Sequence, residues 1–172
     1  MKLKSVQVES ISELQSICKE VYSINFANHW EEGGLEMYLE AQFGDARMQK
    51  DLADPHVLYF FIEEGGENIG FAKAKLQVGM DEYPQATTAE LEKIYILPQH
   101  KGKGIGRKAM TQLMDACKAR SMEHLFLCVI DTNYAAQAFY EKLGFRFHSK
   151  IRLDAPNFKE ELRGLNRMII RL

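Results

Sequence analysis

The sequence predicts an α/β fold with a mixed central sheet of about seven strands, flanked by about four to five helices. Three observations support this class. The 172 residues, 46% of them hydrophobic, suffice for a substantial core, so we expect a single domain over residues 1–172. Strand-like alternation and helix-like spacing follow one another along the chain. Residues 91–129 contain a strand, a glycine-rich loop, a helix and a strand, the pattern of a right-handed crossover.

The first third of the chain predicts one strand followed by helices. Residues 4–8 alternate polar and apolar side chains, as a half-buried strand does. The next segment places Leu14, Ile17 and Val21 on one helical face, and broken helical spacing between residues 26 and 52 predicts two short helices.

The middle of the chain predicts three antiparallel strands. Residues 57–62 are rich in β-branched and aromatic side chains and predict a buried strand. A glycine-containing turn at residues 63–68 leads into a second strand over residues 69–78. A polar segment at residues 79–88 predicts an exposed loop, and residues 89–96 form the third strand.

The remaining residues predict alternating helices and strands. A helix runs from Gly104 to about Arg120, with Ile105, Ala109, Leu113, Ala116 and Cys117 on its buried stripe. A short apolar strand follows at residues 125–129, then a helix at 133–143 that ends before Gly144. Two final strands are expected at residues 145–153 and 166–172. The predicted order β-α-α-β-β-β-α-β-α-β-β is antiparallel at first and parallel at the helical crossover.

Composition excludes several classes of function. Cys18, Cys117 and Cys128 show neither CxxC nor CxH spacing, so we expect core thiols and no metal site. A net charge of -2 and a pI near 6.2 argue against nucleic acid as a partner and are compatible with a cationic substrate. No apolar run is long enough to span a bilayer and no signal-like segment follows Met1, so we expect a cytoplasmic protein with no membrane partner.

The glycine-rich loop has the composition of an anion-binding site. Glycines at positions 102, 104 and 106 permit positive φ and close approach, so backbone N–H groups at a helix N-terminus can face a phosphate. The spacing lacks the GxxxxGK of a Walker A loop. A dinucleotide fingerprint would need glycine at position 107, where the chain has Arg107.

Two groups of polar side chains suggest chemistry near this loop. Glu90 and Glu92 lie two residues apart on the predicted strand, so they share one side while Leu91, Lys93 and Tyr95 point to the other. They form either a solvated face or a general base for an ammonium substrate.

Phe139 and Tyr140 are adjacent on a predicted helix and point about 100° apart. We expect Phe139 to face the core and the Tyr140 hydroxyl to lie near the ligand.

Two motifs carry a family resemblance. KGKGIG, after IYILPQH, resembles the acyl-CoA loop of the GNAT N-acetyltransferase superfamily, and NYAAQAFYEKLGF at Asn133–Phe145 resembles that superfamily's NxxAxxFYxxxGF helix. Lys101 stands where the family usually has Arg or Gln, so it offers a point charge instead of a planar fork. The resemblance spans essentially the whole chain and implies a GNAT-type sheet.

The resemblance implies direct acetyl transfer from acetyl-CoA to an amine. In this scheme Glu92, ahead of Glu90, is the base, Tyr140 protonates the thiolate, and a backbone N–H near Ile94 stabilises the oxyanion. The strand around Ile94 and Ile96 diverges from Val129 to receive the pantetheine arm. The residues that the resemblance assigns to acetyl-CoA binding are Ile94, Tyr95, Ile96, Lys101, Gly102, Lys103, Gly104, Ile105, Gly106, Asn133 and Ala136.

The acceptor is expected to be a polyamine. The first half of the chain resembles the bacterial spermidine/spermine acetyltransferase type, and Trp30, Glu31, Glu32 and Tyr38 are the expected substrate-binding residues. Acidic residues at 31, 32, 81 and 82 are expected to flank the substrate entrance, since acidic walls attract polycations. The alternatives are a protein N-terminus or lysine, another small amine, or a catalytically silent acyl-CoA sensor. A homodimer is also left open.

Overall fold

The computed structural model describes residues 1–172 and contains one seven-stranded sheet. The elements in chain order are β1 (Lys2–Ser5), α1 (Ile11–Phe26), α2 (Gly34–Phe43), α3 (Asp45–Ala53), β2 (Val57–Glu64), β3 (Glu67–Lys75), β4 (Thr88–Ile96), α4 (Ile105–Lys118), β5 (His124–Ile130), α5 (Tyr134–Glu141), β6 (Arg146–Arg152) and β7 (Gly164–Arg171). The predicted class of a mixed α/β fold is confirmed. No helix has the length and apolar character that crossing a membrane would require.

The sheet has the strand order β1-β2-β3-β4-β5-β7-β6. β1 to β4 are antiparallel neighbours, β4 and β5 are parallel, and β5, β7 and β6 are antiparallel again. The parallel pair follows from the crossover through α4, as the sequence predicted.

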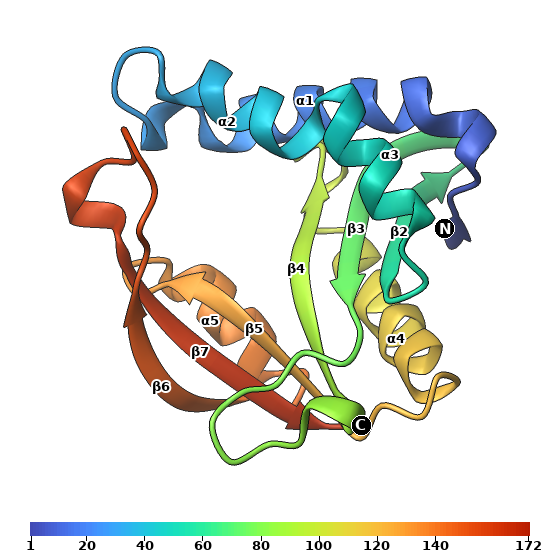
Figure 1. The fold of residues 1–172 in the computed structure, drawn as a ribbon, viewed down its shortest axis with the longest axis vertical. Helices are drawn as coiled ribbons and strands as arrows, with labels where there is room; N and C mark the ends of the chain where they lie inside the picture. The colour runs from blue at the N-terminus through green and yellow to red at the C-terminus, as the bar shows by residue number, and fades with distance from the viewer.

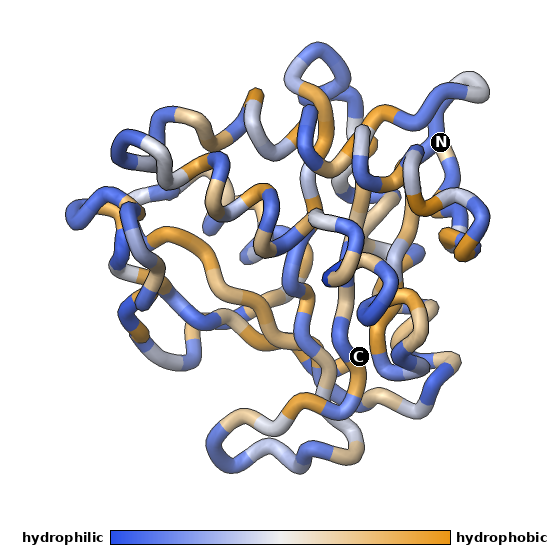
Figure 2. The backbone as a smooth tube through the Cα atoms, turned by 45° about the horizontal axis from the view of Figure 1, so that its top comes forward, coloured by the Kyte–Doolittle hydropathy of each residue, from blue (hydrophilic) through white to orange (hydrophobic).

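The two faces of the sheet carry different helices (Figure 1). α1, α2 and α3 cover β2, β3 and β4 on one side, with a hydrophobic cluster that includes Phe43, Tyr59 and Phe71. On the other side α4 packs on a second cluster that includes Leu91, Leu113 and Leu127, and α5 adds partly buried residues to it. Figure 2 shows that hydrophobic residues concentrate on the central strands, while the connections are mostly hydrophilic.

Several predicted boundaries shift for local reasons. The first strand is residues 2–5 instead of 4–8, because Val8–Ser10 already forms the 3-10 turn that leads into α1. β3 ends at Lys75 instead of residue 78, since Gln77 adopts a left-handed φ of 58° that a strand cannot continue through. The segment after β3 is not wholly exposed, because Met80 is buried.

Candidate active site

The strands β4 and β5 pair for only part of their length. Their register runs from Thr88 opposite His124 to Leu91 opposite Leu127 and stops there. Beyond this point β4 continues beside β3, while β5 continues beside β7, and the two strands diverge (Figure 1). The predicted divergence next to Val129 is therefore present.

The second half of β4 has a free backbone edge on the side of this divergence. The Leu97 N–H donates to the Ile69 carbonyl in β3, and backbone groups alternate sides along a strand. The N–H and C=O groups of Ile94 and Ile96 therefore point toward the missing partner. The Ile96 carbonyl accepts a hydrogen bond from Asn25 Nδ2 at 3.3 Å. An extended ligand can pair with this edge as a further strand would.

The glycine-rich loop lies where β4 turns into α4. Gly102 and Gly104 have φ of 77° and 75°, and Gly104 is the N-cap of α4. The backbone N–H groups of residues 102–107 donate no hydrogen bond within the protein, whereas Lys108 N–H donates to the Gly104 carbonyl. Consecutive free amides at a helix N-terminus bind phosphate groups, since the helix dipole adds favourable potential.

Gly106 has a different role from the one expected. It belongs to α4 and does not adopt positive φ. A Cβ at Gly106 would lie 3.4 Å from the Phe139 ring, so this position faces α5 and leaves room for little more than a methyl group.

Asn133 and Ala136 lie at the start of α5. Asn133 is the N-cap, and its Oδ1 accepts the Ala136 N–H at 3.1 Å. Their predicted contacts with the cofactor arm stay predictions.

Tyr140 lies on the last turn of α5, half-buried against the cluster on that face of the sheet. Its ring centroid is 5.2 Å from that of Phe139, and both rings are half-buried rather than one facing the core alone. Burial raises the pKa of Tyr140 to about 12. The hydroxyl therefore keeps its proton at neutral pH and can donate it to a developing anion.

The prediction for the sides of β4 was partly wrong. Lys93 pairs with Lys73 of β3, and Leu91 pairs with the next residue of β3, Ala74. Glu92 lies between them without a partner and forms a β-bulge. The bulge turns Lys93 and Tyr95 to the same side of the sheet as Glu92, so that of the three residues predicted to point to the other side only Leu91 does so.

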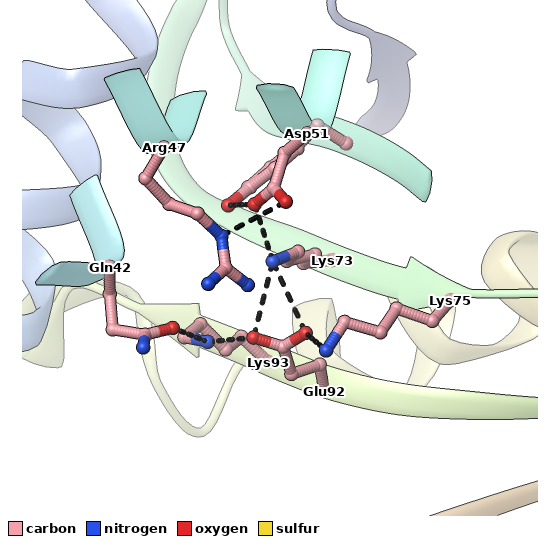
Figure 3. A network of polar contacts seen from close by, with 8 residues as sticks. Gln42, Arg47, Asp51, Lys73, Lys75, Glu92 and Lys93 are labelled. Carbon is pink, nitrogen blue, oxygen red and sulfur yellow. Dashed lines mark hydrogen bonds and ion pairs between the residues drawn. The ribbon is translucent and has the colours of Figure 1, made fainter. Parts of the chain in front are cut away.

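A cluster of ionic side chains, here called the β4 charge network, surrounds Glu92 (Figure 3). Its members are Arg47, Asp51, Lys73, Lys75, Glu92 and Lys93. Lys73 Nζ lies 2.6 Å from Asp51 and 3.2 Å from each Glu92 oxygen, and Lys75 Nζ lies 2.6 Å from Glu92. Lys93 also pairs with Glu92 and donates to Gln42 at 3.2 Å.

The two candidate bases have opposite electrostatic environments. Burial alone would raise the pKa of Glu92, but the ammonium groups of Lys93, Lys73 and Lys75 outweigh it and hold that pKa well below its usual range. Burial raises the pKa of Glu90 above its usual value despite the nearby Lys75, and Glu90 forms no ion pair. Glu90 is therefore the stronger base of the two.

Asn25 of α1 is a site residue that the sequence did not reveal. Its Oδ1 accepts a hydrogen bond from Lys101 Nζ at 2.5 Å, and its Nδ2 donates to the carbonyls of Val21 and Ile96. One amide thus joins the end of β4 to the lysine that begins the glycine-rich loop. Asn25 and Lys101 are 76 positions apart in the sequence, so no local motif could reveal their contact.

The predicted substrate-binding residues fall into two groups. Trp30 is buried, packs on Tyr38 and Phe158 with centroids 4.8 and 4.9 Å away, and joins the β6–β7 connection through a bridge to Phe158. Tyr38 is half-buried in the same cluster. Glu31 and Glu32 are exposed beside this junction. All four remain candidates, with Trp30 and Tyr38 serving mainly as packing.

The acidic residues at 81 and 82 lie far from those at 31 and 32. The β3–β4 connection and the α1–α2 connection are at opposite ends of the molecule in Figure 1. Asp81 lies 2.9 Å from His148 Nε2 and 3.5 Å from Arg167 Nη1, so it is already paired. The four carboxylates do not form one acidic entrance.

Cys128 is exposed, which corrects its expected place in the core. It lies opposite Arg167 in the β5–β7 pair, and it points to the face of the sheet opposite to that of Leu127, which packs in the cluster below α4. Cys18 and Cys117 are buried as expected.

Comparison with known proteins gives a consistent answer. The model of the acetyltransferase (GNAT) family matches residues 14–145. An uncharacterized N-acetyltransferase in the pepI 3' region of Lactobacillus delbrueckii subsp. lactis is 22% identical over 144 residues, which cover 84% of this chain and 83% of that protein.

Two crystal structures share the fold. PaiA N-acetyltransferase from Thermoplasma acidophilum, in complex with coenzyme A, has a TM-score of 0.74, 17% identity and full coverage of both chains. A spermidine N-acetyltransferase SpeG chimera from Vibrio cholerae and hSSAT has a TM-score of 0.69 and 19% identity, covering 99% of this chain and 96% of its own. The diverging strands, the free loop amides and the family match agree: this chain belongs to the GNAT acetyltransferase family and is an acetyl-CoA-dependent N-acetyltransferase.

Proposed function

We propose that the protein transfers acetyl from acetyl-CoA directly to a primary amine of a polyamine such as spermidine or spermine. The observation that carries the amine assignment is Glu90, a half-buried carboxylate on β4 with a raised pKa and no ion-pair partner. An unpaired carboxylate in such a place is suited to bind an ammonium group and then accept its proton.

The chain offers groups suited to hold two parts of acetyl-CoA, the pyrophosphate and the pantetheine arm. The free amides of residues 102–107, with Lys101 beside them, would bind the pyrophosphate, and the free edge at Ile94 and Ile96 would pair with the pantetheine arm. Bound acetyl-CoA supplies the thioester carbonyl that the amine attacks and the sulfur that leaves. The site needs no cysteine nucleophile and no metal for this transfer.

The proton transfers follow from the two titrating groups. Glu90 takes a proton from the acceptor ammonium, so that the amine nitrogen can form the new C–N bond. As the C–S bond breaks, Tyr140 donates its proton to the sulfur, and the second proton that the attacking nitrogen loses on forming the amide restores the Tyr140 hydroxyl. A backbone N–H near Ile94 stabilises the negative charge that develops on the carbonyl oxygen, an effect worth about 3 kcal/mol in other enzymes. Glu92 is held as an ion-paired carboxylate and is the weaker candidate for the base.

The choice of a polyamine rests on Glu31 and Glu32, which are exposed carboxylates without ion pairs and attract the distal ammonium groups of a polycation. The excess of cations over carboxylates in the β4 charge network acts on any acceptor, because like charges favour the neutral form of the reacting amine.

A thiol-release assay over polyamines, amino acids and peptides tests the acceptor. We expect the highest kcat/KM with spermidine and spermine. A good peptide or amino acid substrate beside inactive spermidine and spermine would refute the polyamine assignment and leave the transferase chemistry in place.

The Tyr140→Phe variant tests whether Tyr140 is the proton donor to the leaving sulfur. Loss of the proton donor should lower turnover by about 100-fold, while coenzyme A affinity, measured by calorimetry, stays unchanged. Unchanged turnover would remove Tyr140 from the mechanism.

A further inference from the structure

The backbone at the reacting end of β4 is paired on one side only. β3 pairs with Lys93 to Ile96, whereas pairing with β5 ends at Leu91. The next residue, Glu92, is the bulged residue and has no partner in either strand. The bulge thus lies just before the half-paired segment with the free edge at Ile94, and side-chain contacts are what restrain Glu92 itself.

Lys73 is the contact that joins this bulge to a different layer of the protein (Figure 3). Its side chain is fully buried, and its ammonium group lies between Asp51 of α3 and Glu92 of β4, at 2.6 and 3.2 Å. Lys75 is one-third exposed, and Lys93 is the chain neighbour of Glu92. Among the three lysines, only Lys73 links Glu92 to a second carboxylate.

Asp51 is itself fixed in place. Arg47 Nε lies 3.0 Å from Asp51 one helical turn away, and the Tyr59 hydroxyl donates to Asp51 at 3.4 Å. The Lys73 ammonium also lies 5.3 Å from the centre of the Tyr59 ring. The link from α3 through Lys73 to Glu92 is therefore rigid at its helical end.

Stability alone does not account for a lysine in this position. Ion pairs buried in a protein are often no more stabilising than apolar residues of the same volume, because both charges lose their hydration. Two aromatic residues lie beside Lys73: Phe71, two residues earlier on the same face of β3, and Tyr59, whose ring the ammonium group faces, so an apolar residue would suit the surroundings. What the Lys73 charge holds in place explains its presence better than the stability that it adds.

We infer that Lys73 is a positioning residue for acetyl transfer, which fixes the β4 bulge through Glu92 and thereby sets the backbone N–H and C=O groups of Ile94 and Ile96. It touches neither the acetyl group nor the acceptor. The inference rests on the proposed role of β4 at the acyl group, and it does not depend on which amine is the acceptor.

The test compares Lys73→Met and Asp51→Asn with Lys19→Met as the matched control, since Lys19 pairs with Glu40 and contacts neither Asp51 nor Glu92. With any amine that supports turnover, kcat should fall about tenfold or more for Lys73→Met and several-fold for Asp51→Asn. The coenzyme A dissociation constant should stay within twofold of wild type, because the loop amides are untouched. Lys19→Met should keep kcat within twofold.

Hydrogen exchange of the free protein gives a readout that needs no turnover. The amides of Lys93 and Tyr95, which face β3, should exchange faster in Lys73→Met and Asp51→Asn, with residues 102–107 unchanged. If Lys73→Met does not fold, the double variant Asp51→Asn/Lys73→Met removes the unpaired carboxylate and decides the question. If Lys73 were needed only for stability, the double variant would recover both the melting temperature and kcat, and this result would overturn the inference. Recovered stability with low kcat would support it.

Discussion

The glycine-rich loop and the β4 charge network flank the same reacting end of β4 but work by opposite means. The loop offers backbone N–H groups of consecutive residues on an exposed helix N-terminus. The network consists of side chains from α3, β3 and β4, of which Asp51, Lys73 and Lys93 are buried. The loop should therefore depend on backbone conformation and tolerate side-chain changes, whereas the network should be sensitive to the loss of single side-chain charges.

Removal of the Glu92 charge should produce the largest effect. In Glu92→Gln three lysines lose their shared carboxylate, and breaking a buried ion pair costs about 3–5 kcal/mol. For a chain of this size we expect the melting temperature at pH 7 to fall by about 10 °C, measured by calorimetry. Glu36→Gln, at an exposed position, is the control and should leave it unchanged.

The pH dependence of this difference has a definite sign. Because the folded-state pKa of Glu92 is lowered, its contribution is present above the unfolded-state value of about 4.3 and is lost as pH falls through the folded value. The gap between wild type and Glu92→Gln should therefore narrow below about pH 4. A gap that is the same at pH 7 and pH 3 would show that the charge of Glu92 is not the cause.

Glu90→Gln should separate catalysis from stability on the same strand. Loss of the proposed base should lower kcat by about 100-fold, with coenzyme A affinity unchanged. A carboxyl whose pKa is raised by folding destabilises the fold when it ionises, so the variant should be at least as stable as wild type at pH 7. If Glu92→Gln loses turnover well below its melting temperature and Glu90→Gln does not, the two roles are reversed.

The sequence predicts the loop far better than the network, and the reason is physical. Gly102 and Gly104 act through their own backbone conformation, so their spacing in the sequence is enough to predict the shape of the loop. The orientation of Lys93 depends on a bulge that arises from pairing with β3, and strict alternation from Glu90 misses it.

The same limit applies to exposure and to long-range contacts. The exposure of Cys128 depends on which parts of the sheet the helices cover, which no local pattern reveals. The ion pair of Lys73 with Asp51 joins residues 22 positions apart on different layers. Strand and helix order could be predicted from periodicity, while the partners of buried charges could not.

Gly104→Val should test the backbone dependence of the loop. A β-branched residue is strained at φ of 75°, at a cost of about 1–3 kcal/mol, so the variant should weaken coenzyme A binding by about tenfold or more. Lys103→Ala, at an exposed position of the same loop, should change it less than twofold. Calorimetric titration measures both. Equal losses in the two variants would mean that side-chain charge, not amide geometry, dominates.

The smallest expected effect concerns Lys101, whose ammonium group Asn25 holds at 2.5 Å. A lysine is more flexible than the arginine that the family usually has here, so a fixed acceptor on α1 should preorganise its charge. Asn25→Ala and Lys101→Met should each weaken coenzyme A binding by about two- to fivefold, since one exposed charge contributes about 1 kcal/mol or less. If Asn25 acts only by holding Lys101, the double variant Asn25→Ala/Lys101→Met should bind coenzyme A no worse than Lys101→Met. In that background Asn25 no longer has a lysine ammonium group to hold. Additive losses would instead assign Asn25 to the end of β4, where its amide also meets the Ile96 carbonyl.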